Sequence, residues 1–264
     1  MTAVSPSRTK GHAGPTAPPV LQVDGVSKVF GHGEARVHAL DRISLAVQPG
    51  EFVCLVGASG CGKSTMLHLI AGLDSPTSGT IRVEGRTGLM FQEAALFPWL
   101  TVGGNVALAL RLRGVPRGER RPLVASLLEM VHLGGLGSRR PHELSGGMRQ
   151  RVALARTLAQ DADVLLMDEP FGSLDAMTRD LLHAELERLW TDRRFTVLFV
   201  THNVREAVRL ADRVLVLTSR PGRVATSFDV RIPRPRRIET PAVSALAGEI
   251  TDELSREVRR HGHA

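Results

Sequence analysis

The sequence predicts an α/β fold in which the strands of a parallel sheet carry a phosphate-binding loop at one edge. The apolar run 52–56 is followed directly by the glycine-rich segment 57–65, G-A-S-G-C-G-K-S-T, and then by the helical pattern of 66–73. A second apolar run, 164–167, ends in two carboxylates. Short continuous apolar runs are typical of strands buried on both faces, and ligands bind at the carboxyl ends of such strands.

The glycine-rich segment matches G-x-x-x-x-G-K-[ST] in the strand, loop and helix context that the motif requires. Its glycines let successive N–H groups turn inward toward phosphate oxygens, and the following helix adds the positive end of its dipole. Lys63 is expected to reach the β- and γ-phosphates, and Ser64 to bind Mg²⁺. The alternative is a glycine-rich turn with an incidental lysine. The candidate nucleotide contacts are Gly57, Ala58, Ser59, Gly60, Cys61, Gly62, Lys63, Ser64 and Thr65.

The length of 264 residues suits one large domain, or one domain with a subdomain. The longest apolar runs fall far short of the roughly 18 residues that a membrane span needs. Residues 1–19 lack the apolar stretch of a secretory signal, which predicts a cytosolic chain. In that compartment we expect Cys54 and Cys61 to be free thiols.

The net charge is +7, and only Lys10, Lys28 and Lys63 among the 34 basic residues are lysines. A basic protein can bind nucleic acid or an anionic membrane surface. Here the arginines are scattered and alternate with acidic residues, and aromatic residues make up only 4%. This pattern favours an ordinary solvated surface, so we expect no nucleic acid partner.

The N-terminal third predicts a disordered tail and then a small antiparallel sheet. Residues 1–19 are rich in Pro, Gly, Ser and Thr and show no periodicity. The runs 21–26 and 40–47 alternate between apolar and polar residues, as half-buried strands do. Phe30 is the nearest aromatic before the strand that leads into the phosphate loop. Taken alone it favours a core position, with adenine stacking as the alternative.

The middle of the chain predicts an inserted helical subdomain, at about 95–158. Two strand candidates precede it, 79–83 and 88–91, and Gln92 follows the second. From 102 to 131 the apolar residues recur at spacings of three and four, which indicates helices. Ser145 then caps another helix, whose N-terminus is a second site able to meet an anion.

Asp168 and Glu169 end the apolar strand at 164–167, where they face any ligand of the phosphate loop. Asp168 is expected to hold the Mg²⁺ that Ser64 contacts, and Glu169 to orient and deprotonate a water molecule aimed at the γ-phosphate. The alternative is an acidic pair that merely ends a buried strand at the surface. The presence of the phosphate loop favours the catalytic interpretation.

The last third of the chain predicts a helix through Trp190, a strand over 196–201, a helix over 204–210 and a strand over 214–217. His202 ends the first of these strands at the sheet edge of Asp168, so a γ-phosphate contact is favoured over a structural role. The region 231–264 is expected to be a peripheral tail with a short charged helix at 249–260.

Together these motifs resemble the ATP-binding cassette proteins of ABC transporters over about residues 20–230. The most discriminating segment is Leu-Ser-Gly-Gly-Met-Arg-Gln at 144–150, because other phosphate-loop NTPases lack such a signature between the loop and the Asp-Glu strand. The resemblance implies a P-loop NTPase (ABC ATPase) with a RecA-like core, an N-terminal antiparallel β subdomain and an inserted helical subdomain.

The resemblance also implies ATP and Mg²⁺ as cofactors, and a head-to-tail dimer of two copies. ATP on the phosphate loop of one copy is then closed off by Ser145, Gly146 and Gly147 of the other. The remaining implied roles are adenine stacking for Phe30, Mg²⁺ and water sensing for Gln92, general base for Glu169, γ-phosphate contact for His202 and contact across the dimer for Asp175. Phe30 therefore changes from a core residue to a base platform.

Two further segments, 97–106 and 211–223, look like those of nitrate, sulfonate and taurine importers. This implies an ATP-hydrolysing subunit at the cytoplasmic face of the membrane, with integral permease subunits and an extracytoplasmic substrate-binding protein as partners. In such relatives the first segment lines the groove for the coupling helix of the permease, although Phe97 and Trp99 themselves are expected to be buried packing residues. Two features depart from the family pattern: Asn203 stands where relatives often have Asp, and the link 84–87 before the Gln92 strand is short.

Other functions stay open at this point. The chain can serve an importer of another small solute, and export is a weaker possibility. A cassette ATPase acting on nucleic acid is disfavoured, because the segment between Gln92 and Leu144 is too short for a long coiled coil. Two-cassette translation factors are excluded by length. A kinase or GTPase that uses the phosphate loop alone does not explain the 144–150 signature.

Overall fold

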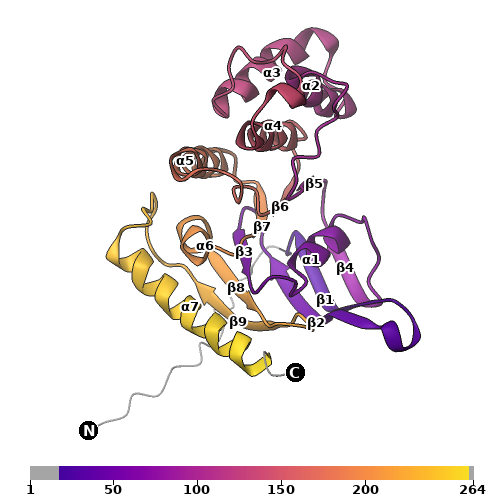
Figure 1. Cartoon of the computed structure of the whole chain (residues 1–264), viewed down its shortest axis with the longest axis vertical. Coiled ribbons are helices and arrows are strands. Elements are labelled where there is room, and N and C mark those ends of the chain that lie inside the picture. Colours follow the sequence, from indigo (N-terminus) through magenta and orange to yellow (C-terminus); the bar gives the residue numbers. More distant parts are fainter. Residues whose placement is uncertain (1–17, 262–264) are drawn as a thin grey trace.

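The computed structural model describes residues 18–261 and contains two sheets (Figure 1). The predicted tail at 1–19 lies outside the described residues, apart from Pro18 and Pro19. Five strands of the larger sheet are parallel, and its last strand is antiparallel to its neighbour. Its spatial order is β5 (Thr87–Met90), β6 (Val164–Asp168), β7 (Thr196–Val200), β3 (Phe52–Val56), β8 (Arg213–Leu217) and β9 (Val224–Asp229).

The smaller sheet is antiparallel and confirms the β subdomain predicted before the phosphate loop. It is formed by β2 (Val37–Val47), β1 (Leu21–Phe30) and β4 (Ser78–Val83), in that order. A short 3₁₀ turn, Gly33–Ala35, joins β1 to β2. The strand β1 runs four residues further than the alternation suggested, because register shifts after Val23 interrupt the pattern without ending the pairing.

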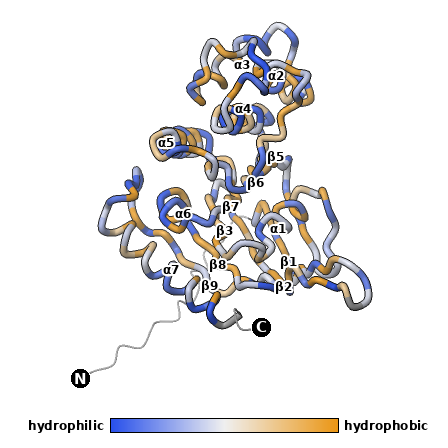
Figure 2. Tube along the Cα trace, in the orientation of Figure 1, coloured by the Kyte–Doolittle hydropathy of each residue, from blue (hydrophilic) through white to orange (hydrophobic). Residues whose placement is uncertain are grey.

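Two hydrophobic cores meet at the central strand β3, whose five residues are all buried. Phe52, Cys54 and Val56 pack into the core beneath the helices, whereas Val53 and Leu55 face the other sheet and helix α1 (Lys63–Ile70). Successive strand residues point to opposite faces, so a strand covered on both sides is apolar throughout. Figure 2 shows the central strands as largely hydrophobic. The end of β3 at Val56 is thereby held in place beneath the phosphate loop.

Helices surround the larger sheet on both sides and at its top. The helices α2 (Val102–Leu112), α3 (Arg117–Met130) and α4 (Gly146–Leu158) lie together at the top of Figure 1, with a 3₁₀ turn at Pro141–Glu143. They fall within the region 95–158 expected for the inserted subdomain. The helices α5 (Ala176–Arg193) and α6 (Val204–Leu210) follow β6 and β7.

The C-terminal region corrects the expectation of a peripheral tail. Helix α7 (Pro241–His261), the yellow helix of Figure 1, begins eight residues before the predicted start at 249 and packs against α6 and β8. Its residues Val243, Ala247 and Ile250 are buried in the same core as Phe52. Leu246 and Leu254 also pack against this core, so the helix has an apolar face that the Pro- and Arg-rich segment before it concealed.

The Pro- and Arg-rich segment before α7 also packs against the rest of the fold. Arg236 is 5% exposed, and its guanidinium donates hydrogen bonds to the carbonyls of Val208, Ala211 and Val230. Burial, as the largest cause, lowers the pKa of Arg236 to about 10. Within residues 18–261, no helix has both the length and the apolar character needed to cross a membrane.

Candidate functional site

The phosphate loop connects β3 to α1, which begins at Lys63. Gly62 precedes the helix with φ +98°, and a Cβ there would lie 2.5 Å from the Leu40 side chain and 2.9 Å from the Ala39 carbonyl oxygen. Only glycine combines this backbone conformation with that close approach. The loop is thus pressed against the antiparallel sheet, and the N-terminus of α1 is left open. Cys54 of β3 and Cys61 of the phosphate loop are both buried free thiols.

Lys63 lies over the loop that precedes it. Its side chain is largely buried, and Nζ donates hydrogen bonds to the carbonyl oxygens of Gly57 and Ala58, both at 2.9 Å. No carboxylate within the described residues forms an ion pair with it. Nζ also lies 3.8 Å from Cys61 Sγ, so its positive charge is held by neutral groups alone and attracts an anion to the mouth of the loop.

A cleft of about 500 Å³ opens in front of the loop. It brings together Phe30 of β1, Gln92 beyond β5 and Glu169 beyond β6 around the loop residues. The residues that line it are Phe30, Val37, Ala39, Ser59, Gly60, Gly62, Lys63, Ser64, Thr65, Gln92, Glu169 and Arg220. Residues separated by more than a hundred positions in the chain thus surround one space of nucleotide size.

Phe30 lies at the exposed end of β1, where 43% of it is accessible to solvent. The core position that the isolated residue favoured is therefore wrong. The Lys28 ammonium lies 4.9 Å from the centroid of the Phe30 ring. An exposed ring at the rim of the cleft is suited to stacking against a planar base.

Asp168 and Ser64 form the part of the site that fits a divalent cation. Asp168 is 5% exposed and accepts a hydrogen bond from the Ser64 side chain, while its Oδ1 has no hydrogen-bond partner within the described residues. Burial raises the pKa of Asp168 above its ordinary value. A buried carboxylate with an unused oxygen beside a hydroxyl fits Mg²⁺, which binds through one or two protein ligands together with phosphate oxygens and water.

Replacing Asp168 with asparagine is expected to remove the Mg²⁺ dependence of nucleotide binding. For the parental chain at about 100 times the Kd, bound nucleotide adds about 2.7 kcal/mol of stability. In a thermal-shift measurement, ATP with Mg²⁺ should raise the Tm of the parental chain by several degrees more than ATP with EDTA. The variant should show equal shifts with and without Mg²⁺. A full Mg²⁺ increment in the variant would contradict the assignment of Asp168.

Glu169 directly follows β6 in a left-handed backbone conformation, φ +44°. Its N–H donates to the carbonyl of Val200 at 2.9 Å, which holds this unusual residue against β7. Its Oε2 lies 3.0 Å from Nδ1 of His202, which follows the end of β7. Strained conformations of this kind are found at functional sites. The two parallel strands therefore place the carboxylate and the imidazole in contact at one edge of the sheet.

The residues of the 144–150 signature, and Asp175, lie outside the cleft around Lys63. Ser145 caps α4 by accepting a hydrogen bond from the Met148 N–H at 3.3 Å, and Asp175 caps α5 in the same way through the Thr178 N–H at 2.9 Å. That backbone hydrogen bond is the main reason why the pKa of Asp175 is lowered. Neither these residues nor Gly146 and Gly147 line the cleft around Lys63.

Polar contacts join the end of β5 to α4. Gln150 donates from Nε2 to the carbonyl oxygen of Gln92 at 3.2 Å, and Arg156 donates to the carbonyl oxygens of Ala94 and Ala95 at 3.0 and 2.7 Å. The segment that carries Gln92 is thus fastened to the helix that begins at the signature.

Arg220 is a site residue that the sequence analysis did not assign. It lines the cleft, and its Nε donates to the carbonyl oxygen of Gly60 at 3.2 Å. Its only sequence signal is its place in the segment 211–223, which resembles importer ATPases. Its cationic group adds a second positive charge beside Lys63.

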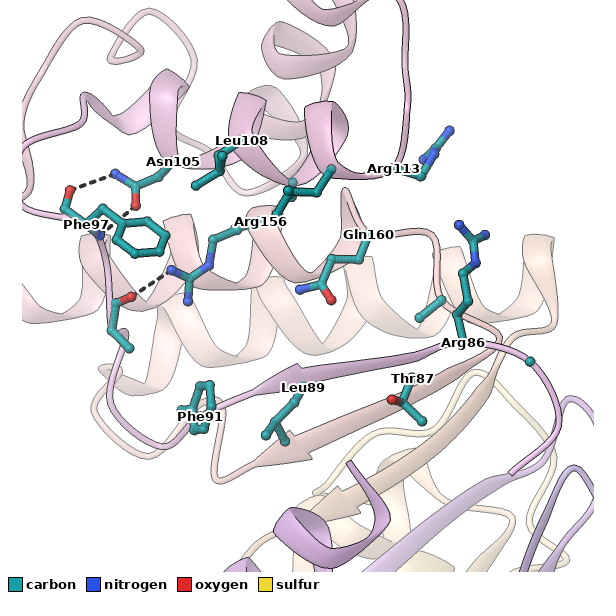
Figure 3. A pocket seen from close by; sticks show the side chains of 15 residues that line it. Arg86, Thr87, Leu89, Phe91, Phe97, Asn105, Leu108, Arg113, Arg156 and Gln160 are labelled. Carbon is teal, nitrogen blue, oxygen red and sulfur yellow. Dashed lines mark hydrogen bonds between the residues drawn. The ribbon is translucent and has the colours of Figure 1, made fainter. Parts of the chain in front are cut away.

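A second and larger hollow, about 700 Å³, lies between β5 and the helices α2 and α4 (Figure 3). Asn105 accepts a hydrogen bond from the Phe97 N–H at 2.8 Å and so holds one rim of this groove. Trp99 near that rim is 67% exposed, so the expectation that it is buried is wrong. The groove is lined by Gly85, Arg86, Thr87, Leu89, Phe91, Ala95, Phe97, Asn105, Leu108, Ala109, Leu112, Arg113, Arg156, Gln160 and Ala162.

The fold and the cleft define a phosphate-loop nucleotide-binding protein with a signature helix in an inserted helical region. The family model of the ABC transporter matches residues 40–172. The chain is 47% identical to the nitrate import ATP-binding protein NrtD of Synechocystis, covering 81% of this chain and 83% of that protein. It is 42% identical to the aliphatic sulfonates import ATP-binding protein SsuB 1 of Agrobacterium fabrum, with 96% and 91% covered.

The taurine import ATP-binding protein TauB of Rhizobium johnstonii is 43% identical over 93% of this chain and 97% of its own length. A solved dimeric structure of the ATP-binding cassette MJ0796, bound to ADP and Pi in a post-hydrolysis state, superposes with a TM-score of 0.74 at 32% identity. It covers 81% of this chain and all of that one. The chain belongs to the ABC transporter ATP-binding family and is an ATP hydrolase, and the relatives named as nitrate, sulfonate and taurine import ATP-binding proteins are 42–47% identical to it.

Proposed function

We propose that this chain couples ATP hydrolysis to the uptake of a small anion, such as nitrate, taurine or an aliphatic sulfonate, across the cytoplasmic membrane. The observation that carries the mechanism is the composition of the cleft: it contains Lys63, Gln92 and Glu169 but neither Ser145 nor Gly147. One chain therefore supplies half of a closed site. A second copy, placed head to tail, supplies Ser145, Gly146 and Gly147, and Asp175 contacts it beside the site.

In the closed site each group has a distinct task. Lys63 and the loop N–H groups bind the β- and γ-phosphates, and Phe30 stacks on adenine. Ser64, Asp168 and Gln92 would hold Mg²⁺, which neutralises charge on the phosphate oxygens. Glu169 accepts a proton from the attacking water, and His202, 3.0 Å from Glu169, contacts the γ-phosphate.

The groove in Figure 3 is the proposed docking site for a permease segment at the cytoplasmic face. Its floor and helical wall include Leu89, Leu108 and Leu112, the last 81% exposed. Arg86 and Arg113 lie together at one end, where Arg113 also pairs with Asp161 at 3.5 Å, and no aspartate or glutamate of the described residues lines the groove itself. An amphipathic helix that carries a carboxylate at that end is complementary to such a surface.

Replacing Leu112 with glutamate is expected to uncouple the ATPase from its permease. The added charge meets an apolar helix face, so permease-stimulated hydrolysis should fall about tenfold. ATP hydrolysis by the chain without permease should stay within about twofold of the parental rate, because Leu112 does not line the nucleotide cleft. Leu123→Glu on α3 is the matched control, since Leu123 is exposed outside the groove. Equal effects of the two substitutions would contradict the docking site.

The transported anion is selected by the permease and an extracytoplasmic binding protein, so its identity is tested on the assembled importer. The chain and its permease are reconstituted in vesicles, and ATPase activity is measured with binding proteins loaded with nitrate, taurine or an alkanesulfonate. We expect one of them to stimulate hydrolysis. Stimulation only by a binding protein loaded with another solute would support an importer of that solute instead. A role on nucleic acid is not favoured, because 93–143 holds α2 and α3 rather than a long coiled coil.

A further inference from the structure

A buried chain of polar contacts joins helix α5 to the turn that carries His202. His183 of α5 is fully buried, and its Nε2 lies 2.6 Å from Oε1 of Glu206 on α6. The second carboxylate oxygen of Glu206 accepts a hydrogen bond from the Thr201 hydroxyl. Glu206 is 4% exposed and Thr201 2%. None of these three side chains has a task in the mechanism above, although burying a carboxylate is costly unless its hydrogen bonds are satisfied.

The direction of each hydrogen bond follows from the neighbours. Nη1 of Arg209 lies 3.4 Å from Nδ1 of His183, and a guanidinium can only donate. Nδ1 is therefore the acceptor, and the ring proton on Nε2 is donated to Glu206. The Thr201 hydroxyl donates to Glu206 and accepts from the Asn203 N–H at 3.0 Å. Each carboxylate oxygen of Glu206 thus receives one donor.

The two ends of this series of polar contacts reach the two segments that carry Glu169 and His202. The bond from Asn203 to Thr201 closes the backbone around His202. At the other end, the His183 ring packs edge-on against Phe171, with centroids 5.0 Å apart and an interplanar angle of 76°. Phe171 is buried and lies two residues after Glu169.

The pairing of β6 with β7 brings these segments side by side, but it leaves a space between them on one side. A cavity of about 40 Å³ lies between them, and Glu169, Phe171, His202 and Glu206 are among the residues that line it. The segments have room to shift relative to each other on this side. The contacts from His183 through Glu206 to Thr201 bridge the same gap and restrict that shift.

We propose that His183 and Glu206 are positioning residues that hold Glu169 and His202 in register, and so set the rate of ATP hydrolysis without contacting nucleotide. This inference rests on the proposed roles of Glu169 and His202. Their contact is at 3.0 Å, and a displacement of about 1 Å in an active site can lower a rate about 100-fold.

The first test replaces Glu206 with glutamine in the full-length chain. The amide group turns an N–H₂ toward either His183 or Thr201, and both of them are donors. We expect kcat for ATP hydrolysis to fall roughly 10- to 100-fold, while KM for ATP changes by less than about twofold. Glu187→Gln is the matched control, because Glu187 is also buried and pairs with Arg234 at 3.4 Å, away from both catalytic segments. Its kcat should stay within about twofold of the parental value.

A second pair of variants keeps the proposal testable where Glu206→Gln fails to fold. Thr201→Val has nearly the parental shape and lacks the hydroxyl, whereas Thr201→Ser retains it. The valine variant should show the low kcat with an unchanged KM, and the serine variant should recover most of the parental kcat. Parental turnover in Thr201→Val, or equal losses in both variants, would overturn the proposal.

The double variant His183→Leu with Glu206→Gln distinguishes one unit from two separate effects. If the residues act together, the double variant loses no more activity than the more affected single variant. Additive losses would overturn a joint role. Failure of the proposed function gives a different result: Glu169→Gln would then hydrolyse ATP at the parental rate. Parental kcat in Glu206→Gln beside an inactive Glu169→Gln overturns only the positioning role.

Discussion

Glu169→Gln is expected to lower the rate of ATP hydrolysis by about 10²- to 10⁴-fold, because the amide cannot accept a proton from the attacking water. Lys63 and Ser64 are unchanged in this variant, so ATP still binds. With hydrolysis blocked, the ATP-bound dimer should accumulate. Phosphate release measures the first effect, and light scattering after size-exclusion chromatography in ATP measures the second.

Glu185→Gln provides the control for this substitution. Glu185 lies on α5 and pairs with Arg188 at 2.9 Å on the surface, outside the cleft. Because exposed ion pairs contribute little stability, this variant should hydrolyse ATP at nearly the parental rate. Parental turnover in Glu169→Gln would remove Glu169 as the general base.

Ser145→Arg is expected to abolish hydrolysis to a similar extent, at least about 100-fold. Ser145 does not line the cleft of its own chain, so nucleotide affinity at the phosphate loop should change by less than about twofold. The arginine also removes the α4 cap, which accepts from Met148. Ser145→Ala separates this contribution, since it loses a cap of about 1 kcal/mol without adding bulk. Hydrolysis and nucleotide affinity are measured on the three chains in parallel.

Mixing two inactive chains tests the head-to-tail arrangement directly. Lys63→Ala lacks a working phosphate loop, whereas Ser145→Arg lacks a working signature. A mixed dimer contains one site in which an intact loop faces an intact signature. Its ATPase activity should therefore exceed the sum of the two chains measured separately. No gain on mixing, with dimers present, would contradict a site shared between two copies.

Much of the site was predictable because its residues sit next to strongly patterned segments. The strands before Gly57 and Asp168 are continuous apolar runs, and they appear in the structure as β3 and β6. Trp99 was not predictable in this way. Its aromatic character suggested a buried position, but the turn at 97–100 leaves it 67% exposed beside the groove.

Helix α7 and the contact between His183 and Glu206 show why other features could be recognised only in the three-dimensional structure. The apolar residues Val243, Ala247 and Ile250 indicate one helical face, but only α6 and β8 show what that face covers. His183 is one of ten histidines, and nothing near it in the chain distinguishes it. Its partner Glu206 is 23 residues away and belongs to the next helix.

The local sequence predicts the chemistry: a loop for phosphate at 57–65, a carboxylate pair at the end of β6, and a signature at 144–150. Those properties reside in residue types at fixed local spacing. The three-dimensional fold sets which of these groups lie together, because parallel pairing of β6 with β7 brings Glu169 to His202 while α4 begins outside the cleft. Such proximity depends on strand register and helix packing, which involve contacts between distant parts of the chain.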